Sequence, residues 1–286
     1  MSRRFRFALI CLLPLVLLAQ QSVSPEDRKR FEEIKSRHDR GEQVSPDDQA
    51  FAMRVMRMLN GNQKGQANQQ RNAEFAKTHP PQDSVGFVPL TELGAGLYKG
   101  EDGGLYPGGS NAPPARHLAM GVKLAHEIVP LDKDGNRSAN GKIVLLTTGM
   151  SNTTMESQAF IKMASGDGDL NPHMVILDGA QGGQTARVIA NPQANYWKVD
   201  EDRLAQAGLS PKQVQAVWLK QANAQPTEPF PAEAKKLEED IRADIKNLTA
   251  HFPNLKQVFL SSRIYAGYAS TPLNPEPHAY ETAFAD

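Results

Sequence analysis

The sequence predicts a three-layer α/β/α domain with a parallel sheet, preceded by a hairpin of helices. Four short apolar runs read as strands, helical patterns lie between them, and the first run, 143–146, is apolar at every position. Continuous hydrophobicity is typical of a strand that helices cover on both faces. Strands separated by helical crossovers pair in parallel, which gives the layered architecture.

Residues 1–21 have the pattern of a secretory signal. Arg3, Arg4 and Arg6 precede an apolar run over 7–18, and a small residue, Ala19, follows that run. Twelve apolar residues are short for a membrane span, which needs about 20, so cleavage after export is favoured over a permanent anchor. We therefore expect a secreted or periplasmic protein without a stable membrane anchor after cleavage. Cys11, the single cysteine, lies in this run, so the mature chain would have no thiol chemistry.

Residues 22–60 predict a helical hairpin. Ser24-Pro25-Glu26-Asp27 and Ser45-Pro46-Asp47-Asp48 each combine a cap, a proline at the first helical position and acidic residues in the first turn. Residues 61–84 are rich in Asn, Gln, Gly and Pro, which predicts a linker and a domain boundary. The α/β domain would then cover residues 85–286.

The α/β domain begins with a glycine-rich segment, 85–114, in which tyrosines, a lysine and acidic residues alternate with glycines. This segment either lines a substrate cleft or is a surface loop. An amphipathic helix over 115–129 follows, with Leu118 and Val122 among the apolar residues on one side. The remaining strands are expected at 174–177, 214–219 and 257–260, with helices at 153–164, about 200–207 and 232–251.

Composition excludes several classes of partner. Lysine plus arginine and aspartate plus glutamate number 32 each in 286 residues, so no global field would recruit nucleic acid. The glycine-rich segment lacks the spacing of a phosphate-binding loop. Asp102 and Asp178 lie beside glycines, as ordinary turn residues do. We therefore expect no nucleic acid, no cofactor and no metal.

Polar residues follow three of the predicted strands. Ser151 follows the first, a glycine-containing loop, 178–185, follows the second, and Asn223 follows the third. Open α/β sheets place their ligands at this edge, where a serine, a loop amide and a carboxamide would make a nucleophile with an oxyanion hole. Taken alone, Ser151 is read first as a residue that caps the following helix.

These blocks resemble those of the SGNH, or GDSL-like, hydrolases, named for a Ser, a Gly, an Asn and a His. Gly149-Met150-Ser151-Asn152 looks like the first block in its Gly-x-Ser-Asn form, which is seen in carbohydrate acetylesterases. Gly183, followed by Gln184-Thr185, matches the oxyanion glycine of the second block. Asn223 matches the asparagine of the third block, although the usual Gly-x-Asn-Asp of that block is here Gln-Ala-Asn-Ala. The resemblance implies a flavodoxin-like sheet.

The stretch from Thr91 onward is also similar to a group of secreted bacterial proteins without an established activity. The shared motifs are YKGEDGGLY, GMSNTT, DGAQGG and SSRIYAGYA. The fourth SGNH block, Asp-x-x-His, does not follow residue 260, and the one late histidine is His278, which is expected as an incidental surface residue. We therefore expect a member of the family that is shortened at its C-terminus.

The resemblance implies a serine esterase that acts on a small-molecule or glycan ester, such as an acylated carbohydrate. Because the Asp-x-x-His block is missing, a non-catalytic module that binds a glycan or a protein partner in the same cleft stays open as an alternative. The expected catalytic residues are Ser151, Gly183, Asn223 and His278. The expected substrate-binding residues are Asn152, Gln184, Arg263, Tyr265 and Tyr268.

Overall fold

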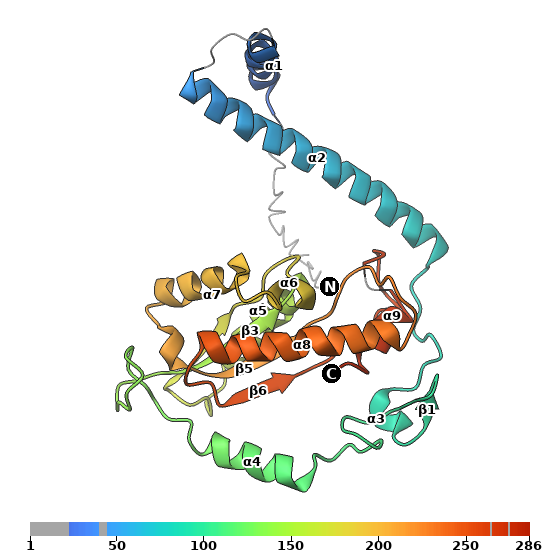
Figure 1. The fold of residues 1–286 in the computed structure, drawn as a ribbon, viewed down its shortest axis with the longest axis vertical. Coiled ribbons are helices and arrows are strands. Elements are labelled where there is room, and N and C mark those ends of the chain that lie inside the picture. The colour runs from blue at the N-terminus through green and yellow to red at the C-terminus, as the bar shows by residue number, and fades with distance from the viewer. Residues whose placement is uncertain (1–22, 40–44, 264, 274) are drawn as a thin grey trace, which may run out of the picture. The chain divides into compact units, whose positions relative to one another are not determined.

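Four parallel strands form the centre of the larger of two compact units. The computed structural model describes residues 23–39, 45–263, 265–273 and 275–286, and the chain divides into units 1–74 and 75–286. In the larger unit the sheet has the order β4-β3-β5-β6 (Figure 1). Its strands are β3 (Ile143–Gly149), β4 (Met174–Asp178), β5 (Val214–Lys220) and β6 (Gln257–Leu260), at the predicted places.

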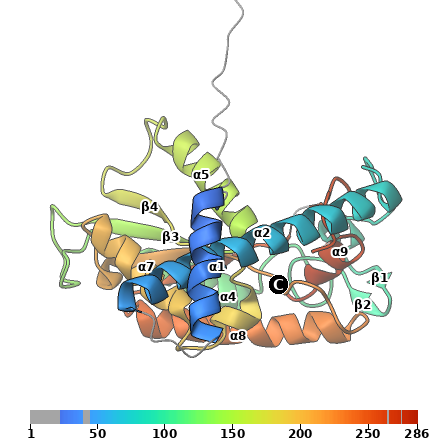
Figure 2. The same ribbon diagram turned by 90° about the horizontal axis from the view of Figure 1, so that it is seen from above.

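Helices cover both faces of this sheet, which confirms the three-layer α/β/α prediction. Helices α7 (Asn195–Gln206) and α8 (Ala232–His251) lie on one side and α5 (Ser151–Ala164) on the other (Figure 2). The α7/α8 side carries the main hydrophobic core, because alternate side chains of β3 and β5 meet the buried faces of both helices. Core residues include Val144, Leu146, Val217, Leu219, Tyr196, Trp197, Leu204, Leu237, Ile241 and Leu248.

The opposite side of the sheet is more polar. On α5 only Thr153 and Ser157 are buried, and the Ser157 hydroxyl donates to Thr147 Oγ1 of β3 at 2.7 Å. Helix α4 (Ala115–Ala125) contacts β6 but has no buried residue, and Leu118 and Val122 are about half exposed. The predicted helix therefore ends four residues early, and its apolar side is not buried.

The glycine-rich segment forms short elements that pack near the C-terminus. It contains α3 (Leu90–Leu93) and the antiparallel pair β1 (Leu97–Tyr98) and β2 (Glu101–Asp102). The Tyr98 hydroxyl donates to Glu281 at 2.9 Å, and the Phe87 ring stacks on Tyr280, with centroids 4.8 Å apart. The remaining elements are α6 (Ala186–Ile189), the 3₁₀ turn η1 (Pro211–Gln213) and α9 (His278–Thr282).

The predicted pair of helices is α1 (Pro25–Asp39) and α2 (Pro46–Thr78), and the smaller unit contains α1 and α2 up to residue 74. Ser24 and Ser45 accept hydrogen bonds from the backbone N–H groups three residues later, at 3.0 and 3.2 Å. Arg30 pairs with Asp48 across the two helices, at 2.9 Å.

Helix α2 continues through residues 61–78, which were expected to be linker. Glutamine, lysine, alanine, arginine and glutamate outweigh the two glycines there and sustain the helix. The helix ends just before Pro80 and Pro81, since residues that precede proline avoid helical geometry. The predicted signal, 1–21, lies outside the described residues.

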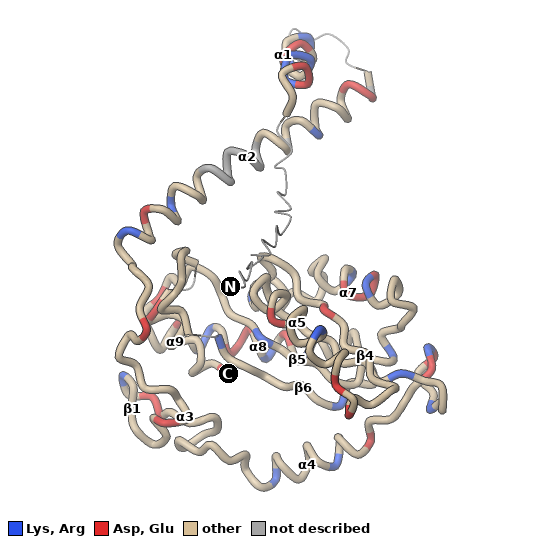
Figure 3. The backbone as a smooth tube through the Cα atoms, turned by 180° about the vertical axis from the view of Figure 1, so that it is seen from behind, with Lys and Arg blue, Asp and Glu red and all other residues tan. Residues whose placement is uncertain are grey.

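Charged residues of both signs are interspersed along the backbone (Figure 3), in keeping with the balanced composition. In the parts of the chain that the structure describes, no helix is both long enough and apolar enough to cross a bilayer.

Candidate functional site

The carboxyl ends of the four strands form one edge of the sheet, because all the strands run in the same direction. Ser151 lies just past β3, the loop 179–185 follows β4, residues 221–223 follow β5, and residues 261–263 follow β6. Parallel pairing therefore brings the three blocks of the sequence motif to the same edge.

Gly149 makes the turn from β3 into α5 possible. A Cβ atom at this position would lie 2.3 Å from both the Lys220 carbonyl oxygen and Thr153 Oγ1, well inside contact distance. Only glycine therefore lets the end of β3 approach β5 and the first turn of α5 so closely. This close approach places Ser151 at the first helical position.

The Ser151 hydroxyl is exposed and has no hydrogen-bond partner among the described residues. Met150, rather than Ser151, occupies the cap position, so the hydroxyl does not cap α5. The loop after β4 passes beside this serine, since a Cβ atom on Gly182 would lie 3.8 Å from Ser151 Cβ. The first N–H groups of α5 have no acceptor within the helix and carry its partial positive charge.

The turn next to Ser151 presents further unpaired N–H groups. Gln184 N donates to Gln181 O at 3.2 Å and closes the turn, whereas the N–H groups of Gly182 and Gly183 have no acceptor in the described part of the chain. Gly183 has a φ of +77°, which glycine adopts readily. Adjacent N–H groups of this kind favour an anion or an oxyanion. Gln184 contributes its carbonyl oxygen to Gln221 Nε2 at 3.0 Å.

Backbone and side-chain bonds hold this turn against β3 and α5. Gln181 N donates to Gly149 O at 2.9 Å, and Thr154 Oγ1 donates to Ala180 O at 2.9 Å. Asp178 Oδ1 accepts from Ala180 N at 3.0 Å. Burial raises the pKa of Asp178, and the hydrogen bond from Ala180 N acts against that effect.

The sequence interpretation missed the polar side of α7 that fixes the same loop. Gln181 Nε2 donates to Asp200 Oδ1 and to Tyr196 O, both at 3.0 Å, and Arg203 Nη1 donates to Ala180 O at 3.0 Å. Asp200 is fully buried, which raises its pKa well above the usual range for an aspartate. The spacing of 196, 200 and 203 on one helical side was the available signal.

Asn223 is buried, and its carboxamide joins two helices. Its Oδ1 accepts from the backbone N–H of Arg187, in α6, at 3.0 Å, and its Nδ2 donates to Asp240 Oδ2, in α8, at 2.6 Å. Neither bond involves Ser151. These contacts indicate that Asn223 connects the end of β5 to α6 and α8.

His278 is 7% exposed, so it is not the surface residue that the sequence suggested. Its Nε2 lies 3.2 Å from the Asn223 carbonyl oxygen. The imidazole thus contacts one predicted site residue, but it is not hydrogen bonded to the Ser151 hydroxyl.

The predicted substrate-binding residues divide into two groups. Asn152 Nδ2 and Arg263 Nε are buried at the carboxyl edge without a partner among the described residues, and burial lowers the pKa of Arg263. Tyr265 and Tyr268 instead contact the segment before the glycine-rich region. The Tyr265 hydroxyl donates to Gln82 O at 2.7 Å, and the Tyr268 hydroxyl bonds to Asp83.

An ion pair between a buried lysine and a partly exposed glutamate lies at the same edge and was not predicted. The Lys220 side chain is 2% exposed, and its Nζ lies 2.6 and 2.7 Å from the two carboxylate oxygens of Glu156 in α5. Desolvation raises the pKa of Asp286 to about 7, while the Lys220 ammonium acts to lower it. A lysine at the end of β5 and an acid in α5, the crossover helix after β3, were the available sequence signals.

No group of three or more histidine, cysteine, aspartate or glutamate side chains in the described residues is arranged to hold a metal ion. Comparison with known proteins found no matching protein family, curated protein or solved structure.

Proposed function

We propose that this chain is a secreted serine ester hydrolase of the SGNH type, acting on an acylated carbohydrate. The observation that carries the proposal is the exposed Ser151 hydroxyl beside the unpaired N–H groups of Gly182 and Gly183. In the proposed reaction, Ser151 Oγ attacks the ester carbonyl carbon, the ester C–O bond breaks, and the alcohol leaves with the proton of the serine hydroxyl. Water then hydrolyses the acyl-serine, which releases the carboxylic acid and restores Ser151. The N–H groups of the glycine turn and of the first turn of α5 stabilise the oxyanion.

Transfer of the serine proton needs a base. His278 is the imidazole near this edge, but it bonds to the Asn223 carbonyl oxygen rather than to Ser151. Catalytic hydrogen bonds often tighten only when substrate binds, so this arrangement is compatible with activity. Without a base in place, we expect slow turnover, because a serine hydroxyl is a weak nucleophile at neutral pH.

A second candidate is a non-catalytic module that binds a glycan or a protein partner at the same edge. It is favoured because no base bonds to Ser151 in the described part of the chain, and because the Asn223 carboxamide bonds to α6 and α8. Unpaired N–H groups and the buried Nδ2 of Asn152 would then bind polar ligand oxygens without reaction.

The discriminating experiment measures turnover and acylation together. The full chain, Ser151→Ala and the control Ser165→Ala, which changes an exposed serine just past the other end of α5, are incubated with p-nitrophenyl acetate. We expect p-nitrophenol release and an acetylated Ser151 by peptide mass spectrometry in the native chain and in Ser165→Ala, and neither in Ser151→Ala. Equal release by all three chains contradicts the esterase proposal.

The binding candidate is tested on the same chains with acetylated xylo-oligosaccharides and their deacetylated counterparts, by calorimetry. Saturable binding without acetate release, retained in Ser151→Ala, supports a binding module. If the chains neither turn over nor bind these ligands, both candidates are wrong.

A further inference from the structure

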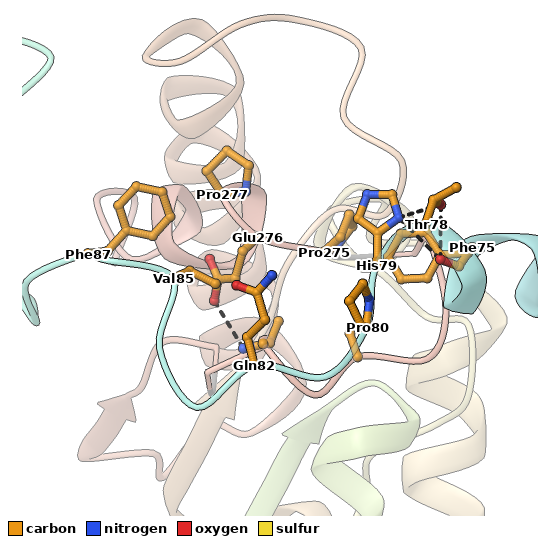
Figure 4. A pocket seen from close by; sticks show the side chains of 13 residues that line it. Phe75, Thr78, His79, Pro80, Gln82, Val85, Phe87, Pro275, Glu276 and Pro277 are labelled. Carbon is orange, nitrogen blue, oxygen red and sulfur yellow. Dashed lines mark hydrogen bonds between the residues drawn. The ribbon is translucent and has the colours of Figure 1, made fainter.

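A concave site lies in the larger unit, and none of the residues around Ser151 lines it. It has a volume of about 270 Å³, near the lower end of small-molecule pockets, which span about 300–1,000 Å³. Figure 4 shows its side chains, which come from the end of α2, from the segment after it and from the connection between β6 and α9. The lining residues are Phe75, Thr78, His79, Pro80, Gln82, Val85, Phe87, Ala266, Gly267, Ala269, Pro275, Glu276 and Pro277.

Hydrogen bonds between distant segments hold the walls of this pocket in place. Gln82 N donates to Gly267 O at 3.0 Å, and Gln82 O accepts from the Tyr265 hydroxyl at 2.7 Å. Tyr268 bonds to Asp83 beside them. The Tyr265 ring packs directly over Gly267, since a Cβ atom there would lie 1.9 Å from the Tyr265 hydroxyl oxygen. The pocket is therefore built into the fold before any ligand arrives.

Among the described residues that line the pocket, Glu276 is the one acid, and none is a lysine or an arginine. Its Oε1 accepts from Ala266 N and its Oε2 accepts from Tyr280 N, each at 3.0 Å. A carboxylate has about four lone-pair sites, so both oxygens retain acceptor capacity beyond these two bonds. In Figure 4 the carboxylate lies between the Gln82 and Phe87 side chains. The pocket therefore favours a ligand with a positively charged group.

Rings and prolines make up most of the remaining wall. The His79 ring stacks on Phe75 with centroids 4.1 Å apart, and Phe87 lies toward the other end of the pocket (Figure 4). Aromatic faces attract cations as well as apolar groups. Proline rings add rigid apolar surface that loses little entropy when it is covered.

We propose that this pocket binds a small organic cation, in which an ammonium group on a compact apolar body is held by Glu276. The ammonium donates to the carboxylate, and the apolar body lies against the rings of Phe75 and Phe87. The proposal is independent of any esterase activity at Ser151.

The test uses three probes that share one ring: benzylamine, benzyl alcohol and benzoate. Each is titrated into the full chain by NMR and calorimetry. Because hydrogen bonds to charged groups are the stronger ones, we expect benzylamine to bind about tenfold more tightly than benzyl alcohol, and benzoate not to bind. Equal affinity of the amine and the alcohol, or no saturable binding of benzylamine, overturns the proposal.

Two variants locate the site. Glu276→Gln is expected to weaken benzylamine binding about tenfold, and its matched control is Glu92→Gln, which changes an exposed carboxylate outside the pocket. Ala269→Leu fills the pocket without changing its charge, and we expect it to abolish benzylamine binding. This variant tests the site even if Glu276→Gln fails to fold. Unchanged benzylamine affinity in Ala269→Leu shows that the amine binds elsewhere and refutes the assignment.

Discussion

Replacing Asp244 by asparagine is expected to stabilise the α/β unit at neutral pH. Asp244 lies on α8, is 0% exposed, and neither carboxylate oxygen has a hydrogen-bond partner among the described residues. Burial, with a smaller contribution from the charge of Asp240, raises its pKa to about 9. The folded protein must therefore keep this acid protonated at pH 7, where the unfolded chain would release the proton.

The size of the effect follows from linkage. The folded pKa lies above the unfolded value of about 3.9, so the free energy of unfolding falls as pH rises from about 4 to about 9. The slope is about 1.4 kcal/mol per pH unit, which amounts to about 4 kcal/mol between pH 4 and pH 7. Asparagine removes this slope but leaves a buried N–H donor that costs about 1–3 kcal/mol at every pH.

The assay is urea unfolding between pH 4 and pH 8, followed by tryptophan fluorescence. The chain has two tryptophans, Trp197 and Trp218, and both lie in the larger unit, so the signal reports that unit alone. We expect the stability of Asp244→Asn relative to the native chain to rise by about 4 kcal/mol from pH 4 to pH 7. Glu239→Gln, on the exposed side of the same helix, should keep the native slope.

The reasoning fails if the difference between Asp244→Asn and the native chain does not change over this pH range. That result would mean that water or a hydrogen-bond donor reaches the carboxylate, contrary to the packing around α8.

Two further predictions concern the carboxyl edge and use the same unfolding assay. Glu156→Gln should cost about 3 kcal/mol at pH 5.5, because it leaves the buried Lys220 ammonium without a counter-charge, and less at pH 8.5, where the ionised Asp286 partly replaces the lost charge. An equal cost at both pH values would contradict this role of Asp286. Gly149→Ala should cost more than about 3 kcal/mol, because the added Cβ overlaps the Lys220 carbonyl oxygen. Gly183→Ala should cost about 1 kcal/mol, because its Cβ meets no atom and only the positive φ at this position is strained. Equal costs for the two glycines would refute the close approach at the end of β3.

Periodicity was sufficient to predict the strands of the sheet and their direction. The runs at 143–146 and 214–219 are largely apolar because helices cover both faces of these strands. This burial shows in the residue types of each run, so the strands can be predicted without knowledge of the rest of the fold. Composition was misleading for residues 61–78, where glycine and asparagine suggested a linker although most neighbouring residues favour a helix. The exposed Leu118 and Val122 show that the apolar pattern of a helix does not predict its burial either, because an apolar stripe is buried only if another surface packs against it.

The candidate site was predictable only where it depends on strand direction. Ser151 and the Gly182–Gly183 turn meet because each follows a parallel strand, and neighbouring strands end at the same edge. The bonding of Asn223 was not predictable, since its partners Arg187 and Asp240 depend on how α6 and α8 pack.

The sequence by itself determined the layered parallel fold and the edge of the sheet at which polar groups gather, because the hydrophobic period and the alternation of strands with helices can be read directly from it. Only the tertiary structure decided which side chains meet there. It paired Lys220 with Glu156, 64 residues away, and it turned Tyr265 and Tyr268 toward residues 82 and 83. Such pairs depend on the angles and distances at which helices pack on the sheet, which no local pattern encodes.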